Sequence, residues 1–402
     1  MSSSVALAPA VAVVAVDVGK TMAALLVTDA ARRRLLGPLD FPMTGAGLAG
    51  VITKTRAVLP AGLVRVGVEA AGHYHRPLAT PAVWPGWQVV QLNPAHVSEQ
   101  RRVMGRRRIK TDALDLEAIT ELLLAGRGVP VGEPSTVITE LTAWVGLRRR
   151  RVSTRVATRN QLLSQLDRCF PGLTLALPNV LGTRVGRLIA EDFADPQRLA
   201  RLGASRFIRF AAARGLQIRR PVADRLIAAA REALPSPDAT VARQILVADL
   251  SLLSSLQEQV QAAEAAMAKL LPQTRFAPLL TVPGWAAVRA SNYAAAVGDP
   301  DRWPSAAQLY RAAGLSPVQY ESAGRRRDSR ISREGSVGLR RALIDLGIGL
   351  WHSDPAAKRY GRQLRARGKN GGVIACAMAH RANKIAFALV RDQAGYDPAR
   401  WD

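Results

Sequence analysis

The sequence predicts an α/β domain at the N-terminus, followed by long paired helices and a mainly α-helical C-terminal domain. Three observations support this prediction. Short apolar runs rich in β-branched residues alternate with helical patterns over residues 1–130. From about Glu140 the apolar residues recur at helical spacing over much longer stretches. Beyond Leu279 the chain is rich in alanine and again helical, apart from one strongly basic segment.

The N-terminal domain begins with a buried strand. Residues 11–18 (VAVVAVDV) are a continuous apolar run that ends in an acid, a pattern typical of a central strand buried on both faces. Gly19 and Lys20 form the turn to the next strand. Strands are predicted at 11–18, 22–29, 63–70 and 87–93. Helices are predicted at 47–59, from Ala95 onward, and from Thr111 to Gly126.

Two long helices are predicted in the middle of the chain. The first begins near Glu140 and carries four consecutive arginines at 148–151, and the second covers 238–271, which contains no glycine or proline. Such a pair favours an antiparallel coiled coil, although two packed bundle helices fit the pattern equally well. Between them, residues 171–236 are interrupted by the segments PGL, LPN and LPSP and are interpreted as a helical insertion.

The C-terminal domain opens with LLTVPGW and continues as a helix to Ala296. A loop containing glycine and proline follows, and residues 321–341 then carry seven arginines against three acids. Two further helices are predicted at 336–352 and 371–391. The predicted domains are therefore 1–130, 131–274 and 275–402.

The charge of the chain is its strongest compositional feature. Among 402 residues, 56 are Lys or Arg and 31 are Asp or Glu, which gives a formal net charge of +25. So much positive charge is unusual in a free-standing metabolic enzyme, because self-repulsion needs a polyanion to offset it. A codon bias towards arginine would explain the choice of Arg over Lys, but it would not explain the shortage of acids. Nucleic acid is therefore the expected partner.

The cysteines and the apolar segments exclude several other classes of protein. Cys169 and Cys376 are far apart and neither belongs to a CxxC pair, which excludes a zinc ribbon or a redox motif. We expect both to be buried thiols in a reducing compartment. The apolar stretch from Val5 to Val16 is too short to cross a bilayer, and no Lys or Arg precedes Lys20. We therefore expect a cytoplasmic, nucleoid-associated protein with no membrane partner.

Four acids form the strongest chemical pattern. Asp17 and Glu69 end two predicted strands, and ligand sites of open α/β sheets gather at the carboxyl ends of strands. Asp112 and Asp115 are three residues apart on a predicted helix and share one face of it. Carboxylates gathered in one place repel each other unless cations neutralise them, and hard oxygen ligands favour Mg²⁺ or Mn²⁺. Any one of these acids alone fits a helix cap or a surface carboxylate better, but together in a basic protein they favour a metal site.

A basic run precedes the second pair of acids. Residues 101–110 (RRVMGRRRIK) include six basic residues and no acid. Such a run usually forms a solvated face, but beside a metal site it would follow the phosphates of a nucleic acid. Nucleic-acid contacts are predicted at Lys110, beside the scissile phosphate, and at Arg106, Arg107 and Arg108.

Several segments occur in the order and spacing of a known family. VAVDVGKT, GVEAAGHYHRPL, LNPAHV and RRIKTDALDLEAI resemble the N-terminal domain of the IS110-type transposases, a RuvC-like family with a DEDD signature. TVPGW, AAGLSPVQYESAGRRRDSRISREGSVGLRRAL and RYGRQLRARGK resemble the C-terminal transposase domain of the same family. The resemblance covers roughly residues 1–130 and 275–392.

The resemblance implies a ribonuclease-H-like (RuvC-like) fold for the N-terminal domain and a Mg²⁺- or Mn²⁺-dependent site. It implies that the four acids named above are both catalytic and metal-binding. It also implies a serine nucleophile within YESAGRRR, which we assign to Ser322 and which would form a transient phosphoserine link to DNA. We expect Ser322 to lie in a loop just before the three arginines. Arginines in this region would hold the phosphate, namely Arg325, Arg326, Arg327, Arg330 and Arg333.

The resemblance also implies partners. These are DNA, as element ends and target, and a structured guide ("bridge") RNA that pairs with both. The long helices would mediate a homodimer and, on DNA, a homotetramer. The acids and the serine would then form a composite site.

Without the family resemblance, the residues also permit other functions. A metal-dependent DNA nuclease or Holliday-junction resolvase would use the same acids with water and would not need Ser322. A basic architectural DNA binder with a degenerate site is disfavoured because all four acids are present. VDVGKT also resembles the phosphate loop of actin-like sugar kinases, but the glycine-rich adenosine motifs of those kinases are not found.

Overall fold

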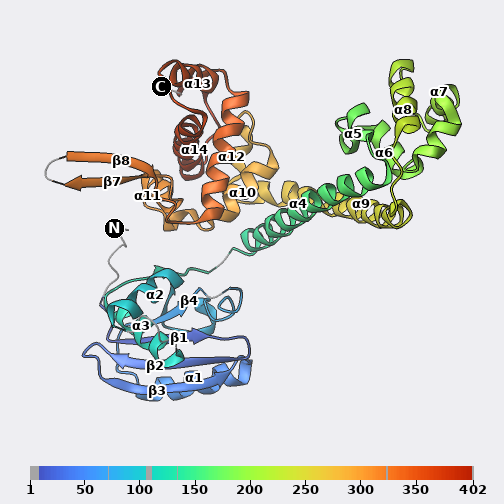
Figure 1. Cartoon of the computed structure of the whole chain (residues 1–402). Helices are drawn as coiled ribbons and strands as arrows, with labels where there is room; N and C mark the ends of the chain where they lie inside the picture. Colours follow the sequence, from blue (N-terminus) through green and yellow to red (C-terminus); the bar gives the residue numbers. More distant parts are fainter. Residues whose placement is uncertain (1–8, 71, 106–110, 134, 323–324, 401–402) are drawn as a thin grey trace. The chain divides into compact units, whose positions relative to one another are not determined.

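The computed structural model describes residues 9–70, 72–105, 111–133, 135–322 and 325–400. The chain forms two compact units that divide after Thr136 (Figure 1). The first unit is a mixed sheet covered by helices, and the second is almost wholly helical.

The N-terminal unit is built on a sheet with the order β3-β2-β1-β4-β5-β6. β1 pairs antiparallel with β2 and parallel with β4, so the sheet is mixed. Its strands are β1 (Ala12–Val18), β2 (Met22–Asp29), β3 (Arg34–Pro42), β4 (Val64–Glu69), β5 (Gln88–Leu92) and β6 (Val129–Pro130). Its helices are α1 (Gly45–Val58), η1 (Pro81–Val83), α2 (Pro94–Val103) and α3 (Asp112–Leu124). This mixed sheet with its helices fits the predicted ribonuclease-H-like domain.

The two faces of the sheet have separate cores because successive side chains of a strand point to opposite faces. Val14 and Val16 of β1 are buried in the same core as Val51 of α1. Ala15, which lies between them, belongs to the core on the other side with Leu116 of α3. The apolar run of β1 is thus buried on both sides, as its composition predicts.

The four predicted strands and three predicted helices of this unit are confirmed to within a few residues. Two strands were not predicted, the short β6 and the long β3. Gly37 and Pro38 interrupt the sequence pattern of β3, and proline cannot donate a hydrogen bond to a neighbouring strand. β3 tolerates them because it is the edge strand and pairs only with β2 within the described sheet.

The second unit consists of helices and one β-hairpin. Its first half holds α4 (Thr136–Cys169), α5 (Leu173–Ala176), η2 (Val180–Gly182), α6 (Arg184–Asp192), α7 (Pro196–Ala213), α8 (Arg220–Glu232) and α9 (Ala239–Leu270). Its second half holds η3 (Leu271–Gln273), η4 (Ala277–Thr281), α10 (Ala287–Val297), η5 (Pro300–Arg302), α11 (Ala306–Ala312), β7 (Pro317–Ser322), β8 (Arg325–Ile331), α12 (Val337–Ser353), α13 (Pro355–Ala366), α14 (Gly371–Asp392) and η6 (Pro398–Arg400).

The long helices α4 and α9 lie side by side and antiparallel. Arg148 Nε of α4 lies 2.7 Å from Glu264 Oε1 of α9. Further along, Arg155 Nη1 donates to Gln257 Oε1 at 2.6 Å, so position rises on α4 as it falls on α9. The predicted antiparallel pair of helices is therefore present. The two contacts named above are polar, whereas a coiled coil is held by a repeating apolar seam. A coiled coil in the strict sense stays a prediction.

Two hydrophobic cores lie along this helix pair. One joins the C-terminal end of α4 and the N-terminal end of α9 to α5–α8, which form a lobe of residues 171–236 (Figure 1). The other joins the opposite ends of α4 and α9 to α10–α14. By length and composition alone, Ala239–Gln273 and α14 would be long and apolar enough to cross a membrane. Ile374 and Met378 of α14, however, are fully buried in the second core.

The predicted loop around Ser322 is wrong. β7 and β8 pair antiparallel, and Ser322 is the last residue of β7, in register with Arg325. Alternation is hard to recognise in this segment because the strands are short and mostly polar. The expectation for the cysteines holds for Cys169, which is buried, while Cys376 is only partly buried.

Candidate active site

Asp17 and Glu69 occupy neighbouring positions on two parallel strands. The register of β1 and β4 pairs Val16 with Val68, and the next residue of each strand is one of these acids. Both side chains are half-buried. The two strands run in the same direction, so the acids lie at the same edge of the sheet, where the carboxyl ends of parallel strands meet.

Asp17 and Glu69 point towards the face of the sheet that α3 covers. Asp17 is two residues from Ala15, which lies in the core shared with α3. Glu69 is two residues from Gly67, and a Cβ at Gly67 would lie 2.6 Å from Leu123 of α3. The missing side chain of Gly67 therefore allows α3 to approach the strands closely, which brings the acids of α3 onto the same face.

Asp112 and Asp115 lie in the first turn of α3. Thr111 caps this helix, and its hydroxyl accepts a hydrogen bond from Leu114 N at 3.3 Å. The positive end of the helix dipole favours carboxylates at these positions. Asp112 is exposed at the start of α3, whereas Asp115, three residues further along the helix, is buried.

Arg101 of α2 is the partner of the buried acid. Its Nε lies 2.9 Å from Asp115 Oδ1, and the two side chains are 17% and 4% exposed. A buried carboxylate needs such a charge partner, because desolvation of an isolated charge costs several kcal/mol. Sequence reasoning placed Arg101 in a solvated basic run and missed this role. No spacing rule could reveal it, because the pair joins two helices.

The four acids suit a divalent cation, since carboxylate oxygens are the ligands that Mg²⁺ and Mn²⁺ prefer. The structure brings Asp17 and Glu69 together and places Asp115 on the same face. Within the described ranges, however, no three His, Cys, Asp or Glu side chains lie close enough to hold one metal ion. Arg101 engages one oxygen of Asp115 in the arrangement described.

Two models of one transposase family match this chain. The model of the IS110-type DEDD domain, described as "Transposase", matches residues 14–171. The model described as "Transposase IS116/IS110/IS902 family" matches residues 277–362, and the two matches together span more than half of the chain. The chain belongs to the IS110 family of transposases. Residues 172–276 of this transposase lie outside both matches.

Several proteins of insertion elements are similar to this transposase, two of them over most of its length. The IS110 uncharacterized 43.6 kDa protein of Streptomyces coelicolor is 26% identical over 72% of each chain. The IS116 uncharacterized 44.8 kDa protein of Streptomyces clavuligerus is 25% identical over 84% of each chain. The transposase for insertion sequence element IS1328 of Yersinia enterocolitica is 30% identical over 33% of this chain and 41% of its own.

Family membership makes this transposase a DNA-processing enzyme with DNA as its substrate. The DEDD type of its N-terminal domain points to the use of a divalent metal. Membership of this family excludes the alternative that the chain is an actin-like sugar kinase.

The predicted nucleic-acid contacts of the transposase divide into three groups. Arg106, Arg107, Arg108 and Lys110 lie outside the described residues. The side chains of Ser322, Arg325, Arg326 and Arg327 also lie outside the described part, although their backbone positions on β7 and β8 are described. Arg330 and Arg333 are exposed, which leaves them accessible, and their contacts stay a prediction.

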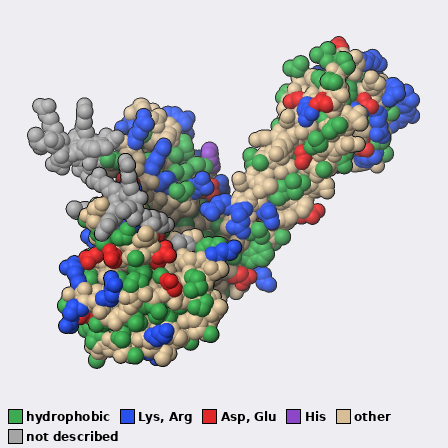
Figure 2. Space-filling model, turned by 60° about the horizontal axis from the view of Figure 1, so that its bottom comes forward, with side chains coloured by type: hydrophobic (Ala, Val, Ile, Leu, Met, Phe, Trp, Pro, Cys, Tyr) green, Lys and Arg blue, Asp and Glu red, His purple; other side chains and the backbone are tan. Residues whose placement is uncertain are grey.

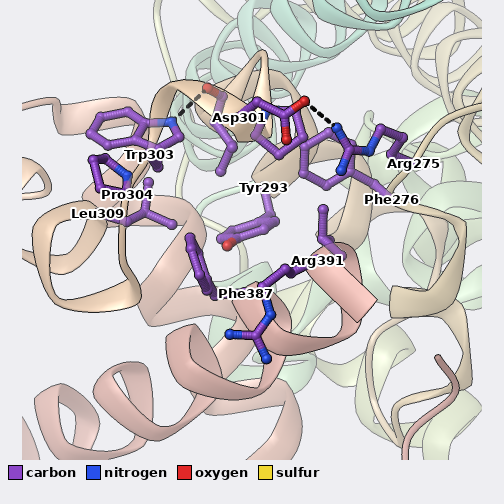
Figure 3. Close-up of a pocket in the computed structure, with 12 residues that line it drawn as sticks. Arg275, Phe276, Tyr293, Asp301, Trp303, Pro304, Leu309, Phe387 and Arg391 are labelled. Atoms are coloured by element: carbon purple, nitrogen blue, oxygen red, sulfur yellow. Dashed lines mark hydrogen bonds and ion pairs between the residues drawn. The ribbon is translucent and has the colours of Figure 1, made fainter. Parts of the chain in front are cut away.

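A separate pocket of about 210 Å³ lies among the C-terminal helices (Figure 3). Tyr293 and Phe387 line it, and Arg275 Nη1 lies 2.6 Å from Asp301 Oδ2 on the same lining. Burial raises the pKa of Tyr293. Among the described residues, none of the predicted site residues lines this pocket, and the one acid of its described lining is paired with arginine, so we assign it no catalytic role. Tyr293 and the buried Trp285 pack in the hydrophobic core of this half of the unit.

Proposed function

We propose that this transposase is an RNA-guided DNA recombinase of an insertion sequence. It cuts and exchanges DNA strands with the carboxylates Asp17, Glu69, Asp112 and Asp115, a divalent cation and the nucleophile Ser322. The observation that carries the proposal is the adjacency of Asp17 and Glu69 at the ends of parallel strands. They lie on the sheet face covered by the helix that holds the other two acids.

Mg²⁺ or Mn²⁺ is the proposed cofactor. When bound, it would stabilise the negative charge that develops on a scissile phosphodiester. Asp17 and Glu69 would hold it first, because they already lie side by side. Asp115 would join them only after Arg101 releases it. Until then Arg101 neutralises Asp115, so the carboxylates do not repel each other.

Ser322 is the proposed nucleophile. Its Oγ loses a proton and forms a bond to phosphorus, while the bond from phosphorus to the departing strand breaks and the departing oxygen takes up a proton. The phosphoserine link keeps the phosphodiester energy, so a hydroxyl of another strand can attack it without an external energy source. The pairing of Ser322 with Arg325 in one hairpin supports this role, since guanidinium groups bind phosphate well.

The proposed partners are a structured guide RNA, target DNA and further copies of the chain. The net charge of +25 supports nucleic-acid partners, because arginines contact the phosphate backbone without reading its sequence. Base pairing by an RNA could then supply sequence choice. Val241, Ile245 and Leu252 lie on one face of α9 and are exposed, which supports dimers or tetramers formed through the long helices. The proposed place of action is the cytoplasm, at the nucleoid.

The test is a denaturing-gel assay for a covalent protein–DNA adduct. The reaction contains DNA of the element end, its flanking transcript and Mg²⁺. Wild type is compared with Ser322→Ala and Asp112→Ala. A matched control is Ser332→Ala, in which a nearby serine of the same basic segment is changed. We expect the adduct in wild type and in the control, and in neither of the other two variants.

Two outcomes would contradict parts of the proposal. Cleaved DNA without an adduct, in wild type and in Ser322→Ala alike, would identify a nuclease or resolvase that uses water. An adduct of equal yield without the transcript would remove the guide RNA from the mechanism.

A further inference from the structure

The lobe of residues 171–236 carries an unusual surface for a small helical subdomain. Its sequence contains eleven arginines, no lysine and five acids. All eleven arginines are exposed. Figure 2 shows Lys and Arg side chains gathered along the outer edge of the lobe. The lobe also has its own hydrophobic core, so these arginines project from an ordered scaffold.

Three of these arginines surround one hollow. Arg198, Arg201 and Arg206 of α7 line it together with Phe193 and Phe210. Its volume is about 380 Å³. Arg198 and Arg201 make no described ion pair with a carboxylate, so their charges are available to an anion.

A break in α7 creates the hollow. Gly203 has φ 73° and ψ 162°, a conformation that is essentially restricted to glycine. The break interrupts the helical hydrogen bonds, and Arg206 makes up for part of this loss. Its Nε donates to Leu202 O at 2.8 Å, and its Nη2 donates to Arg201 O at 3.0 Å. Arg198 and Arg201 lie before the break and Arg206 lies after it, so the break places them around one hollow.

Aromatic rings contact the guanidinium group of Arg198 in the hollow and that of Arg214 nearby. Arg198 lies over the ring of Phe193 at 5.4 Å, and Arg214 lies over Phe210 at 3.7 Å. The two rings contact each other edge to face, with centroids 5.0 Å apart. A guanidinium stacked on a ring keeps its hydrogen-bond donors free, and less side-chain entropy is lost when it binds an anion.

We propose that this hollow binds the phosphodiester backbone of a nucleic-acid duplex, with Arg198 and Arg201 as the contacts. A polyanion fits a hollow lined by three arginines in a lobe that carries eleven exposed arginines and five acids. The inference rests on one part of the proposed function, which is that the transposase binds nucleic acid. It assigns a role to a segment that neither family match covers.

The test measures binding of the full chain to a 30-base-pair DNA duplex of arbitrary sequence and to an RNA duplex of the same length, over a range of salt concentrations. Arg198→Gln/Arg201→Gln is compared with Arg225→Gln/Arg231→Gln. The control pair removes the same charge from exposed positions of the same lobe that do not line the hollow. All four side chains are exposed, so we expect both double variants to fold.

Each lost phosphate contact lowers the salt slope of binding by about 0.9 on duplex DNA. Loss of two contacts is therefore expected to lower the slope by about 1.8 and the affinity at 0.1 M salt by about sixtyfold relative to wild type. The control variant should lose much less. The duplex that shows the larger difference identifies the backbone, DNA or RNA, that the hollow binds.

Equal losses in the two double variants on both duplexes would overturn the inference, because they would reflect only the net charge. Wild-type protein that binds neither duplex would instead contradict the proposed function itself.

Discussion

Arg101 Nε lies 2.9 Å from Oδ1 of Asp115, and this ion pair joins α2 to α3 beneath the surface of the N-terminal domain. It links the stability of the domain to the chemistry of its candidate site. The same carboxylate that is proposed to meet a metal ion is neutralised by an arginine in the arrangement described.

The first prediction concerns this ion pair. Arg101→Gln leaves Asp115 buried without its charge partner, and removal of one partner of a buried pair costs about 3–5 kcal/mol. We expect the free energy of unfolding of the variant to fall by this order, and Mg²⁺ to restore part of it, because the ion can replace the guanidinium. Urea unfolding with and without Mg²⁺ measures both effects. Arg102→Gln, at the exposed neighbouring position, is the control, and an equal response of the two variants would count against the role of Arg101.

The second prediction concerns Glu69. Glu69→Gln keeps the shape of the side chain but removes its charge, so a cation at this edge of the sheet loses a ligand. We expect DNA cleavage to be lost while binding of a DNA duplex is kept, because one negative charge is removed from a surface that binds a polyanion. Cleavage and binding assays on the same preparation separate the two effects. Glu99→Gln on α2 should cleave like wild type. Full cleavage by Glu69→Gln would exclude this acid from the site.

The third prediction tests how closely α3 must approach the sheet. A Cβ at Gly67 would lie 2.6 and 2.7 Å from the two methyl carbons of Leu123, which is fully buried. Overpacking of this kind costs about 1–3 kcal/mol, so Gly67→Ala should lower the free energy of unfolding by that amount. It should also weaken cleavage, because α3 carries two of the acids.

Gly50→Ala provides the comparison for Gly67→Ala. Gly50 lies on the exposed face of α1, and an added Cβ there meets no atom within 4 Å. This change should stabilise the chain by about 0.5–1 kcal/mol, because glycine is unfavourable inside a helix. Urea midpoints that shift in the same direction for both variants would contradict the close approach of α3.

The fourth prediction concerns the pH dependence of stability. Burial raises the pKa of the Cys169 thiol above that of the unfolded chain, so the folded state keeps a proton that the unfolded state loses. The contribution of Cys169 to stability is therefore constant below the unfolded thiol pKa and decreases as pH rises above it. Unfolding midpoints measured from pH 7 to pH 10 should show this decrease, and Cys169→Ser should reduce it.

Alkylation gives an independent check on Cys169. The thiolate is the reactive species, so a buried thiol with a raised pKa should react with iodoacetamide only after unfolding. Burial also raises the pKa of Cys376, but this residue is only partly buried and should react faster in the folded protein. Equal rates for the two residues would be inconsistent with the burial of Cys169.

Much of the N-terminal domain follows from local sequence. The apolar runs that form β1 and β4 end in Asp17 and Glu69, and a strand buried on both faces needs such a run whatever surrounds it. The cap at Thr111 likewise sets the start of α3, which places Asp112 and Asp115 on its first turn. The sequence by itself therefore determined β1, β4 and the start of α3, while the role of the four acids in one site stays a prediction.

The tertiary structure decided what local patterns do not encode. β3 exists as a strand because its edge position tolerates Pro38, and Ser322 lies on a hairpin because β8 pairs with β7. The partner of Asp115 is Arg101 only because α2 and α3 pack together, and the hollow of the lobe depends on the break at Gly203. Each of these features joins residues through packing or hydrogen bonds between separate elements. Such contacts depend on the whole fold, whereas periodicity and capping depend only on neighbours in the chain.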